Sequence, residues 1–319
     1  MARFLITDYD FHDVDLEVGL LRDAGMEVVT AQCRTEQDVI AAAKGCDGLL
    51  SQYAPANAQV FEALPEVRIV SRLGAGFDTV NIDDARRHGV WVANSPDYGV
   101  GEVASHALAL ALSLVRHVAF YDRDVRASKW HYTSAGMLRR PSELSLGILG
   151  FGRIGRRMAW LAQPVFKEIL ACDPYLAAGD FSAPVRRVGL EALFAESDLV
   201  SLHVPLNDET RAIAGAAMLA RMKRGSWLVN TARGAVADVD AVLAALDSGQ
   251  LDGAALDVLP VEPPPAGHPV VSHPRMLVTP HAAFYSQESE QELRRKAVQN
   301  LVDWARTGRP RYVVSEGRS

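Results

Sequence analysis

The chain has 319 residues, a net charge of −6 and no block of Lys and Arg, so we expect no nucleic acid and no anionic membrane as a partner. Hydrophobic residues make up 49% and charged residues 23%, which is typical of a globular protein and excludes a disordered one. The length predicts about two domains, with one large barrel as the alternative.

The three cysteines, Cys33, Cys46 and Cys172, lie far apart and form no C-x-x-C pair. Neither a disulfide framework nor a thiolate zinc site fits this spacing, and we expect no metal. The first residues show no basic segment followed by an apolar one, so we expect no signal peptide. The longest apolar stretch, about residues 104–115, is interrupted by polar side chains and is too short to span a bilayer. These features predict a cytoplasmic protein.

Short runs rich in β-branched residues alternate with helical patterns in the N-terminal third of the chain. The predicted strands are Arg3–Thr7, Glu27–Thr30, Gly48–Ser51, Arg68–Arg72 and Val90–Ala93. Helical patterns lie between them, including Asp15–Ala24 and Glu36–Lys44. Alternation at this spacing predicts βαβ units and a mostly parallel sheet.

A single long helix is predicted next, over about Gly101–Arg123. Its apolar residues are dense nearly all round, so we expect it to be buried between two bodies. The polar, irregular sequence from Asp124 to Ser142 predicts a boundary segment.

A second α/β series follows from Leu144 onward. Its predicted strands are Leu146–Leu149, Ile169–Cys172, Leu199–His203, Trp227–Asn230, Ala254–Leu256 and Leu277–Val278. Its predicted helices are Gly155–Ala162, Leu190–Ala195, Ala216–Arg221 and Asp238–Ser248, and an amphipathic helix, Glu288–Thr307, comes last. The series predicts a second parallel sheet.

A G-x-G-x-x-G motif, Gly150 to Gly155, joins the end of one predicted strand to the start of a helix. Its glycines allow a tight turn, the approach of the backbone to a pyrophosphate, and close packing of helix on strand. The phosphates would bind the free N–H groups at the helix start. Asp173 ends the next strand, where an acidic residue accepts hydrogen bonds from ribose hydroxyls and repels a 2′-phosphate. The motif predicts binding of NAD in preference to NADP.

Three polar residues follow predicted strands of the second series: Arg233, Glu262 and His281. Ligands of open α/β sheets gather at the carboxyl ends of strands. Arg can hold a carboxylate bidentately, and His can give a proton to a forming alkoxide. A nearby carboxylate favours the charged imidazolium. Taken singly, each residue also allows an ordinary role: a surface ion pair, a solvated loop acid and a capped core histidine.

Together these segments resemble the D-isomer-specific 2-hydroxyacid dehydrogenases, over about residues 47–300. The matching pieces are Gly74-Ala75-Gly76-Phe77-Asp78, the glycine motif, His203-Val204-Pro205-Leu206, Asn230-Thr231-Ala232-Arg233-Gly234, Asp257-Val258 with Glu262-Pro263, and Thr279-Pro280-His281. The resemblance implies an NAD-dependent D-2-hydroxyacid dehydrogenase, or 2-oxoacid reductase, whose catalytic residues are Arg233, Glu262 and His281.

The family fold implies an α/β protein with two doubly wound parallel-sheet domains. A Rossmann-type NAD-binding domain would cover residues 101–283. A discontinuous, flavodoxin-like substrate domain would cover residues 1–100 and 284–319. Family members usually dimerise through the long helix and its neighbours, which implies a homodimer formed through the nucleotide domain.

The resemblance also implies the binding residues. Cofactor binding falls to Gly150, Gly152, Arg153, Ile154, Gly155, Asp173, His203, Val204, Pro205, Thr210, Thr231, Ala232, Arg233, Asp257, His281 and Ala283. Substrate binding falls to Tyr53, Arg72, Leu73, Gly74, Ala75, Gly76, Arg233, His281 and Phe284.

Within the family, the segments Ser71–Gly76 and Thr279–Ser286 are similar to the branch of the C-terminal binding proteins. Animal members of that branch also act as NAD-sensing corepressors. An NAD(H)-sensing binding or corepressor-like protein with residual dehydrogenase activity is therefore the alternative function. We expect the enzyme instead, because the catalytic set is complete and no long disordered tail is present.

The side chain of the substrate stays open at this point. Glyoxylate, hydroxypyruvate, a branched 2-oxo acid and a phosphorylated or phosphonate acid all agree with the sequence. A related dehydrogenase of formate or phosphite is a further alternative. The intact set of Arg233, Glu262 and His281 favours a 2-hydroxy acid over formate, and nothing specific supports phosphite.

Overall fold

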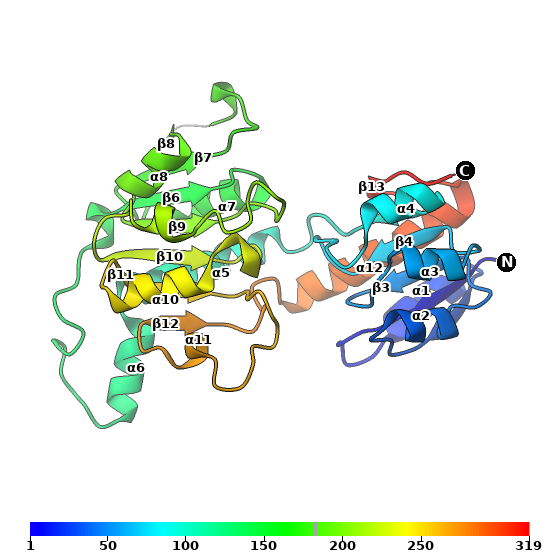
Figure 1. Ribbon diagram of the computed structural model, residues 1–319, viewed down its shortest axis with the longest axis horizontal. Coiled ribbons are helices and arrows are strands. Elements are labelled where there is room, and N and C mark those ends of the chain that lie inside the picture. Colours follow the sequence, from blue (N-terminus) through cyan, green and yellow to red (C-terminus); the bar gives the residue numbers. More distant parts are fainter. Residues whose placement is uncertain (182–183, 319) are drawn as a thin grey trace. The chain divides into compact units, whose positions relative to one another are not determined.

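The computed structural model describes residues 1–181 and 184–318, and the chain divides into two compact units (Figure 1). We call Met1–Gly99 with Ser286–Ser319 the terminal unit and Val100–Tyr285 the central unit. Residue 319, at the end of the predicted substrate domain, lies outside the described residues. The terminal unit is thus built from both ends of the chain, whereas the central unit is continuous.

The terminal unit contains a sheet in the order β13-β5-β4-β3-β1-β2. Its strands are β1 (Arg3–Ile6), β2 (Glu27–Thr30), β3 (Gly48–Ser51), β4 (Ile69–Arg72), β5 (Trp91–Ala93) and β13 (Val313–Ser315). The first five pair in parallel in the 2-1-3-4-5 order of flavodoxin-like folds. Strand β13 adds an antiparallel edge beside β5. The predicted flavodoxin-like sheet is confirmed.

Five helices accompany this sheet: α1 (Asp15–Asp23), α2 (Glu36–Ala42), α3 (Ala58–Ala63), α4 (Ile82–His88) and α12 (Gln287–Thr307). Helix α12 packs against α1, β3 and β4, so the C-terminal segment completes the fold of the N-terminal one (Figure 1). Arg294 of α12 donates two hydrogen bonds of 2.7 Å to the carboxylate of Glu17 on α1, which is fully buried. This bidentate pair joins segments that lie far apart in the sequence.

The central unit contains a fully parallel sheet in the order β12-β11-β10-β9-β6-β7-β8. Its strands are β6 (Ser145–Leu149), β7 (Glu168–Cys172), β8 (Val185–Arg187), β9 (Leu199–Leu202), β10 (Ser226–Asn230), β11 (Leu251–Leu256) and β12 (Met276–Val278). The order is that of a Rossmann fold with one further strand, as expected.

Helices cover both faces of the central sheet (Figure 1). They are α5 (Val100–Val115), α7 (Arg153–Ala162), α8 (Leu190–Glu196), α9 (Ala216–Leu219), α10 (Val239–Asp247) and α11 (Pro269–Ser272). Successive strand residues point to opposite faces: Leu228 joins the core beneath α8 and α10, and Val229 joins the core beneath α5 and α7. The strands are therefore continuously apolar, as in other two-sided parallel sheets.

The single helix predicted over about Gly101–Arg123 is wrong: the segment forms α5 and a second helix, α6 (Val118–Arg126), bent by 61°. Between them His117 has φ +52°, a left-handed conformation that ends α5, and its Nε2 lies 3.2 Å from Asp252 Oδ2. Helix α5 packs on α7 and β10, whereas α6 has no buried residue. Buried residues therefore occur in α5 (Ala104, Ala107, Leu110, Ala111 and Val115) and not in α6, and burial of the segment between two bodies stays a prediction.

Within residues 1–181 and 184–318, no single helix is long and apolar enough to cross a membrane. The α5–α6 pair reaches that length and apolarity only when both bent helices are counted together.

Candidate active site

The predicted chemical residues of the central unit follow its strands at one edge of the sheet. Because all seven strands run in parallel, their carboxyl ends meet at that edge. Six of these strands are directly followed by the residues Gly150 (after β6), Asp173 (after β7), His203 (after β9), Thr231 (after β10), Asp257 (after β11) and Thr279 (after β12).

The glycine loop between β6 and α7 has the geometry that a dinucleotide requires. Gly150 has φ +91°, and a Cβ there would lie 2.6 Å from the His203 carbonyl oxygen. Gly155, in the first turn of α7, packs on the Gly150 carbonyl. At Gly152, the N-cap of α7, no side chain caps the helix and nothing lies within 4 Å of an added Cβ. The N–H groups at the start of α7, beside Arg153, are therefore available to a ligand, and open space lies next to them.

Asp173 braces this loop as well as ending β7. Its Oδ2 accepts the N–H of Phe151 at 2.9 Å, and its Oδ1 accepts the N–H of Tyr175 at 3.1 Å. Each carboxylate oxygen retains a lone pair for a ligand hydroxyl. The bond to Phe151, which sequence reasoning did not foresee, ties the loop to the acid.

The loop after β9 forms a wall of the same edge. Burial lowers the pKa of His203 to about 4, and its Nε2 lies 2.9 Å from Ser201 Oγ, so the ring is neutral at pH 7. Thr210 Oγ1 donates to the Pro205 carbonyl at 2.6 Å and closes the turn that follows Val204.

The loop after β10 carries Arg233. Asn230, fully buried, accepts the N–H of Ala232 at 3.0 Å and donates to the Arg233 carbonyl at 2.9 Å. A Cβ at Gly234 would lie 1.9 Å from the carbonyl carbon of Leu259, so a glycine lets the loops after β10 and β11 touch. The bracing by Asn230 was missed, although an Asn at a strand end signals such a turn.

Glu262 and His281 form a hydrogen-bonded pair. The Oε2 of Glu262 lies 2.7 Å from His281 Nδ1, and its Oε1 accepts the N–H of Leu259 at 2.7 Å. A carboxylate only accepts, so Nδ1 carries the proton of this bond. Among the described residues, His281 Nε2 has no hydrogen-bond partner and is free to exchange a proton with a ligand.

The pKa of Glu262 is lowered. Burial opposes the shift and is the largest single influence, but the hydrogen bonds from His281 and Leu259 and the charges of His281 and Arg233 together outweigh it. The carboxylate therefore stays ionised beside the imidazole.

Asp257 holds the segment that contains His281. It is 2% exposed, and its carboxylate accepts the N–H groups of Ala282 and Ala283, each at 2.9 Å. Phe284 follows, with its ring centroid 6.3 Å from that of His281 in an edge-to-face arrangement. The structure thus brings Asp257, His281, Ala283 and Phe284 together.

The predicted substrate residues Tyr53, Arg72 and the loop 73–76 belong to the terminal unit. Tyr53 follows β3, Arg72 is the last residue of β4, and the loop 73–76 follows β4. The Arg72 guanidinium lies over Gly74, where a Cβ would be 1.1 Å from its Nη1, and donates to the Leu73 carbonyl at 2.6 Å. Tyr53 Oη donates to Asp10 at 3.0 Å. Partial burial and the charge of Asp10 raise the pKa of Tyr53 to about 12, so the hydroxyl stays protonated.

A residue that sequence reasoning missed, Asp8, organises the loop of Tyr53. It follows β1, is 5% exposed, and accepts the N–H groups of Gln52, Tyr53 and Ala54 at 3.1, 2.6 and 3.1 Å. The only sequence signal is an acid directly after a strand.

The residues of the central edge fit NAD. The glycine loop offers free N–H groups and open space, and Asp173 offers acceptors for ribose hydroxyls. Thr231 Oγ1 is buried and, within the part of the chain that the structure describes, has no hydrogen-bond partner, as expected of a group that a ligand completes. No group of three or more His, Cys, Asp or Glu that could hold a metal occurs among the described residues.

Comparisons with known proteins agree with this geometry. The family model "D-isomer specific 2-hydroxyacid dehydrogenase, NAD binding domain" matches residues 108–283. A glyoxylate reductase from Korarchaeum cryptofilum (strain OPF8) is 37% identical over 284 residues, which cover 87% of this chain and 85% of the relative. A hydroxypyruvate reductase from Thermotoga maritima is 32% identical over 307 residues, which cover 94% of this chain and 98% of the relative.

A solved structure of a glyoxylate reductase from Paecilomyes thermophila superposes with a TM-score of 0.89 at 26% identity, and the match covers 98% of both chains. Fold and site thus define an NAD-dependent oxidoreductase with two α/β units. The chain belongs to the D-isomer-specific 2-hydroxyacid dehydrogenase family. Its activity is the transfer of a hydride between nicotinamide and the C2 atom of a 2-oxo or 2-hydroxy acid.

Proposed function

We propose that this enzyme reduces a small 2-oxo acid of the glyoxylate and hydroxypyruvate class with NADH. The observation that carries the proposal is the His281–Glu262 pair, joined at 2.7 Å beside the loop of Arg233 at the carboxyl edge of the sheet. The names of the relatives from Korarchaeum cryptofilum and Thermotoga maritima support the substrate class.

Three side chains of the central unit perform the chemistry in this proposal. NADH supplies the hydride that reaches C2 of the substrate. The Arg233 guanidinium holds the substrate carboxylate and polarises the adjacent carbonyl. His281 gives the proton on Nε2 to the carbonyl oxygen, so that hydride and proton together yield the 2-hydroxy acid. Glu262 stabilises the imidazolium that precedes this transfer.

The substrate-binding roles of further residues belong to this proposal. In the terminal unit, Arg72 and the N–H groups of the loop 73–76 assist carboxylate binding, and Tyr53 contacts the substrate. In the central unit, Phe284 contacts the substrate. Asp8 fixes Tyr53 through the three N–H bonds of its loop. The finer likeness to the branch of the C-terminal binding proteins, and a cytoplasmic location, stay predictions.

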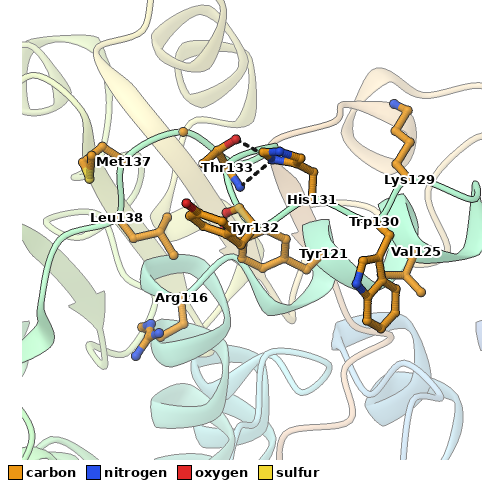
Figure 2. A pocket seen from close by; sticks show the side chains of 11 residues that line it. Arg116, Tyr121, Val125, Lys129, Trp130, His131, Tyr132, Thr133, Met137 and Leu138 are labelled. Carbon is orange, nitrogen blue, oxygen red and sulfur yellow. Dashed lines mark hydrogen bonds between the residues drawn. The ribbon is translucent and has the colours of Figure 1, made fainter.

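We further propose that the enzyme is a homodimer formed through the central unit. Helix α6 and the segment that follows it expose large apolar side chains: Trp130, Tyr132 and Met137 are 86%, 85% and 97% exposed. They surround a hollow of about 830 Å³ whose rim also includes Tyr121 and Val125 (Figure 2). Such a cluster is typical of a surface that a partner covers. Light scattering should give twice the mass of the 34.6 kDa chain, and Trp130→Glu should shift it toward the monomer.

A panel of 2-oxo acids with NADH tests the proposed activity. Glyoxylate and hydroxypyruvate should give the highest kcat/KM, above a branched 2-oxo acid, and formate or phosphite with NAD should give no rate. Arg233→Lys keeps the charge but loses the planar fork, so kcat/KM should fall roughly 100-fold with little change in NADH affinity. NADH binding without turnover of any 2-oxo acid would instead favour the sensing protein.

A further inference from the structure

We propose that His106, Thr279 and Asp257 form a positioning chain that fixes the main chain of His281, and that His106 and Thr279 thereby tune the catalytic step without touching the substrate. The inference rests on the proposed role of His281. It adds two residues to which neither the sequence motifs nor the relatives give a role.

The main chain at His281 needs to be held. His281 has φ +54°, a left-handed conformation that is uncommon for residues other than glycine. Asp257 imposes it through three successive N–H groups. Its carbonyl oxygen accepts the N–H of His281 at 2.8 Å, and its carboxylate accepts those of Ala282 and Ala283. The segment is therefore wrapped around one buried acid.

Thr279 orients that acid. Its Oγ1 donates to Asp257 Oδ1 at 2.5 Å, the same oxygen that accepts the N–H of Ala282. Thr279 also stands two residues before His281, so one hydroxyl joins the start of the catalytic loop to the carboxylate that holds its remainder. Loss of this bond leaves the Asp257 carboxylate held only by the N–H groups of the loop that it positions, so the carboxylate and that loop can shift together.

His106 closes the chain from helix α5. Its Nε2 lies 3.1 Å from Thr279 Oγ1 and 3.7 Å from Asp257 Oδ1. The hydroxyl proton of Thr279 is committed to the carboxylate, so the Thr279 oxygen accepts from His106, and the ring carries its proton on Nε2. This bond ties the catalytic loop to a helix that is packed on α7 and β10. His106 contacts Thr279 and not the His281 ring, so it is a positioning residue.

Substitutions of Thr279 test the chain. Thr279→Val keeps the shape and removes the hydroxyl, and kcat should fall about 10- to 100-fold, the scale of a misplaced catalytic group. KM for the 2-oxo acid should change less than kcat, because Arg233, which holds the substrate carboxylate in the proposal, is untouched. Thr279→Ser restores the hydroxyl and should restore kcat. Equal rates in the Val and Ser variants would overturn the proposal.

Substitutions on α5 supply the second arm and its control. His106→Leu should lower kcat in the same direction as Thr279→Val, and the double variant should lose no more than the larger single loss, because both remove one chain. His106→Gln keeps an N–H donor and should retain more activity. Ser105→Ala is the matched control: Ser105 is exposed at the neighbouring position, and its hydroxyl donates to the Glu102 carbonyl of the same helix. Fully additive losses in the double variant would contradict the chain.

A readout independent of turnover separates this inference from the proposed function. The ring resonances of His281, followed by NMR without substrate, should move in Thr279→Val and His106→Leu and return in Thr279→Ser. If the His281 resonances do not change in either variant, the positioning chain is wrong, even if the enzyme reduces glyoxylate. If they change but the enzyme reduces no 2-oxo acid, the proposed function is wrong and the positioning chain is supported.

Discussion

At the amino ends of the central strands the buried carboxylate of Asp198 is surrounded by cations, whereas at the carboxyl ends the buried carboxylate of Asp257 is surrounded by uncharged donors. Asp198 accepts from Arg139 at 2.6 Å and from Lys223 at 3.1 Å, and Ser145 donates from both its N–H and its hydroxyl. Among the described residues, neither Lys nor Arg forms an ion pair with Asp257 or with Asp173.

We infer from this difference that the amino edge of the sheet contributes to stability and the carboxyl edge to the chemistry. A buried acid that is paired with Lys and Arg is costly to substitute, because removal of one partner leaves the other charges uncompensated, and its own charge is already neutralised by those partners. A buried acid that is held by N–H groups and a hydroxyl is equally satisfied in hydrogen bonds, but its charge remains available to a ligand or to a neighbouring ring. Substitutions at the carboxyl edge should therefore change activity, and substitutions at the amino edge should change unfolding.

Among the substitutions that test this difference between the two edges, His281→Ala should have the largest effect on activity. His281→Ala removes the proton donor, and kcat for the 2-oxo acid should fall roughly two to four orders of magnitude, the usual scale for a positioned acid. Fluorescence titration should show that NADH still binds, and the thermal midpoint should stay in place because the His281 ring is partly exposed. A variant that keeps its rate would remove His281 from the chemistry.

The opposite pattern is expected for Asp198. Burial raises its pKa, but the bonds from Ser145, Arg139 and Lys223 outweigh burial and bring the pKa down to about 2 from 3.8. A lowered pKa contributes stability that is complete above pH 3.8 and is lost as the pH falls through about 2, which corresponds to about 2 kcal/mol.

Asp198→Asn should therefore lower the free energy of unfolding at pH 7 by about 2 kcal/mol and flatten its decline between pH 4 and pH 2. Urea unfolding at several pH values measures both. The rate of NADH oxidation at pH 7 should match the wild type. An Asp198→Asn variant that is stable but inactive would contradict the inferred difference between the two edges.

A smaller effect is expected for Asp173, which meets the cofactor. A carboxylate beside a 2′-phosphate is unfavourable, so kcat/KM should be at least about tenfold higher with NADH than with NADPH. Asp173→Ala should narrow that ratio, and it should also weaken NADH binding because Phe151 loses its acceptor. Equal use of the two cofactors by the wild type would refute the proposed preference.

The smallest effect, and the most specific, concerns Glu262. Glu262→Gln keeps the shape but removes the negative charge that favours a protonated ring at His281. The alkaline limit of reduction should move to lower pH, with only a modest loss of rate at the optimum. The pH–rate profile of reduction measures the change. An unmoved profile would show that the pair does not work as proposed, whatever the role of His281.

Much of this organisation follows from the sequence. Strand–helix alternation predicts two parallel sheets, and a parallel sheet collects its carboxyl ends, so residues from Gly150 to His281 were expected at one edge. Local patterns do not report contacts between distant segments. Strand β13 is short and pairs antiparallel with β5, far away in the chain, and it was not predicted. The left-handed turn at His117 was also missed, because a non-glycine residue there gives no local signal.

The candidate site likewise contains residues that the sequence predicts and residues that it does not. Arg233, Glu262 and His281 could be predicted because each lies in a loop that follows an apolar strand, where ligands of open α/β sheets gather. The contacts of Asp8 with the Tyr53 loop and of His106 with Thr279 depend on which loops the fold brings together. His106 in particular sits within an apolar helix, where its pattern does not distinguish a buried core histidine from one with a role.

The discontinuous terminal unit fixes the order in which this protein can mature on the ribosome. Strands β1–β5 emerge first, but their partners α12 and β13 are made only after the whole central unit, which at cellular rates takes about 10–40 s. Until then Glu17 lacks Arg294, and the sheet face that α12 covers is open. The continuous central unit can fold in that interval. The N-terminal segment is thus the part of the chain that waits longest for its packing partners during synthesis.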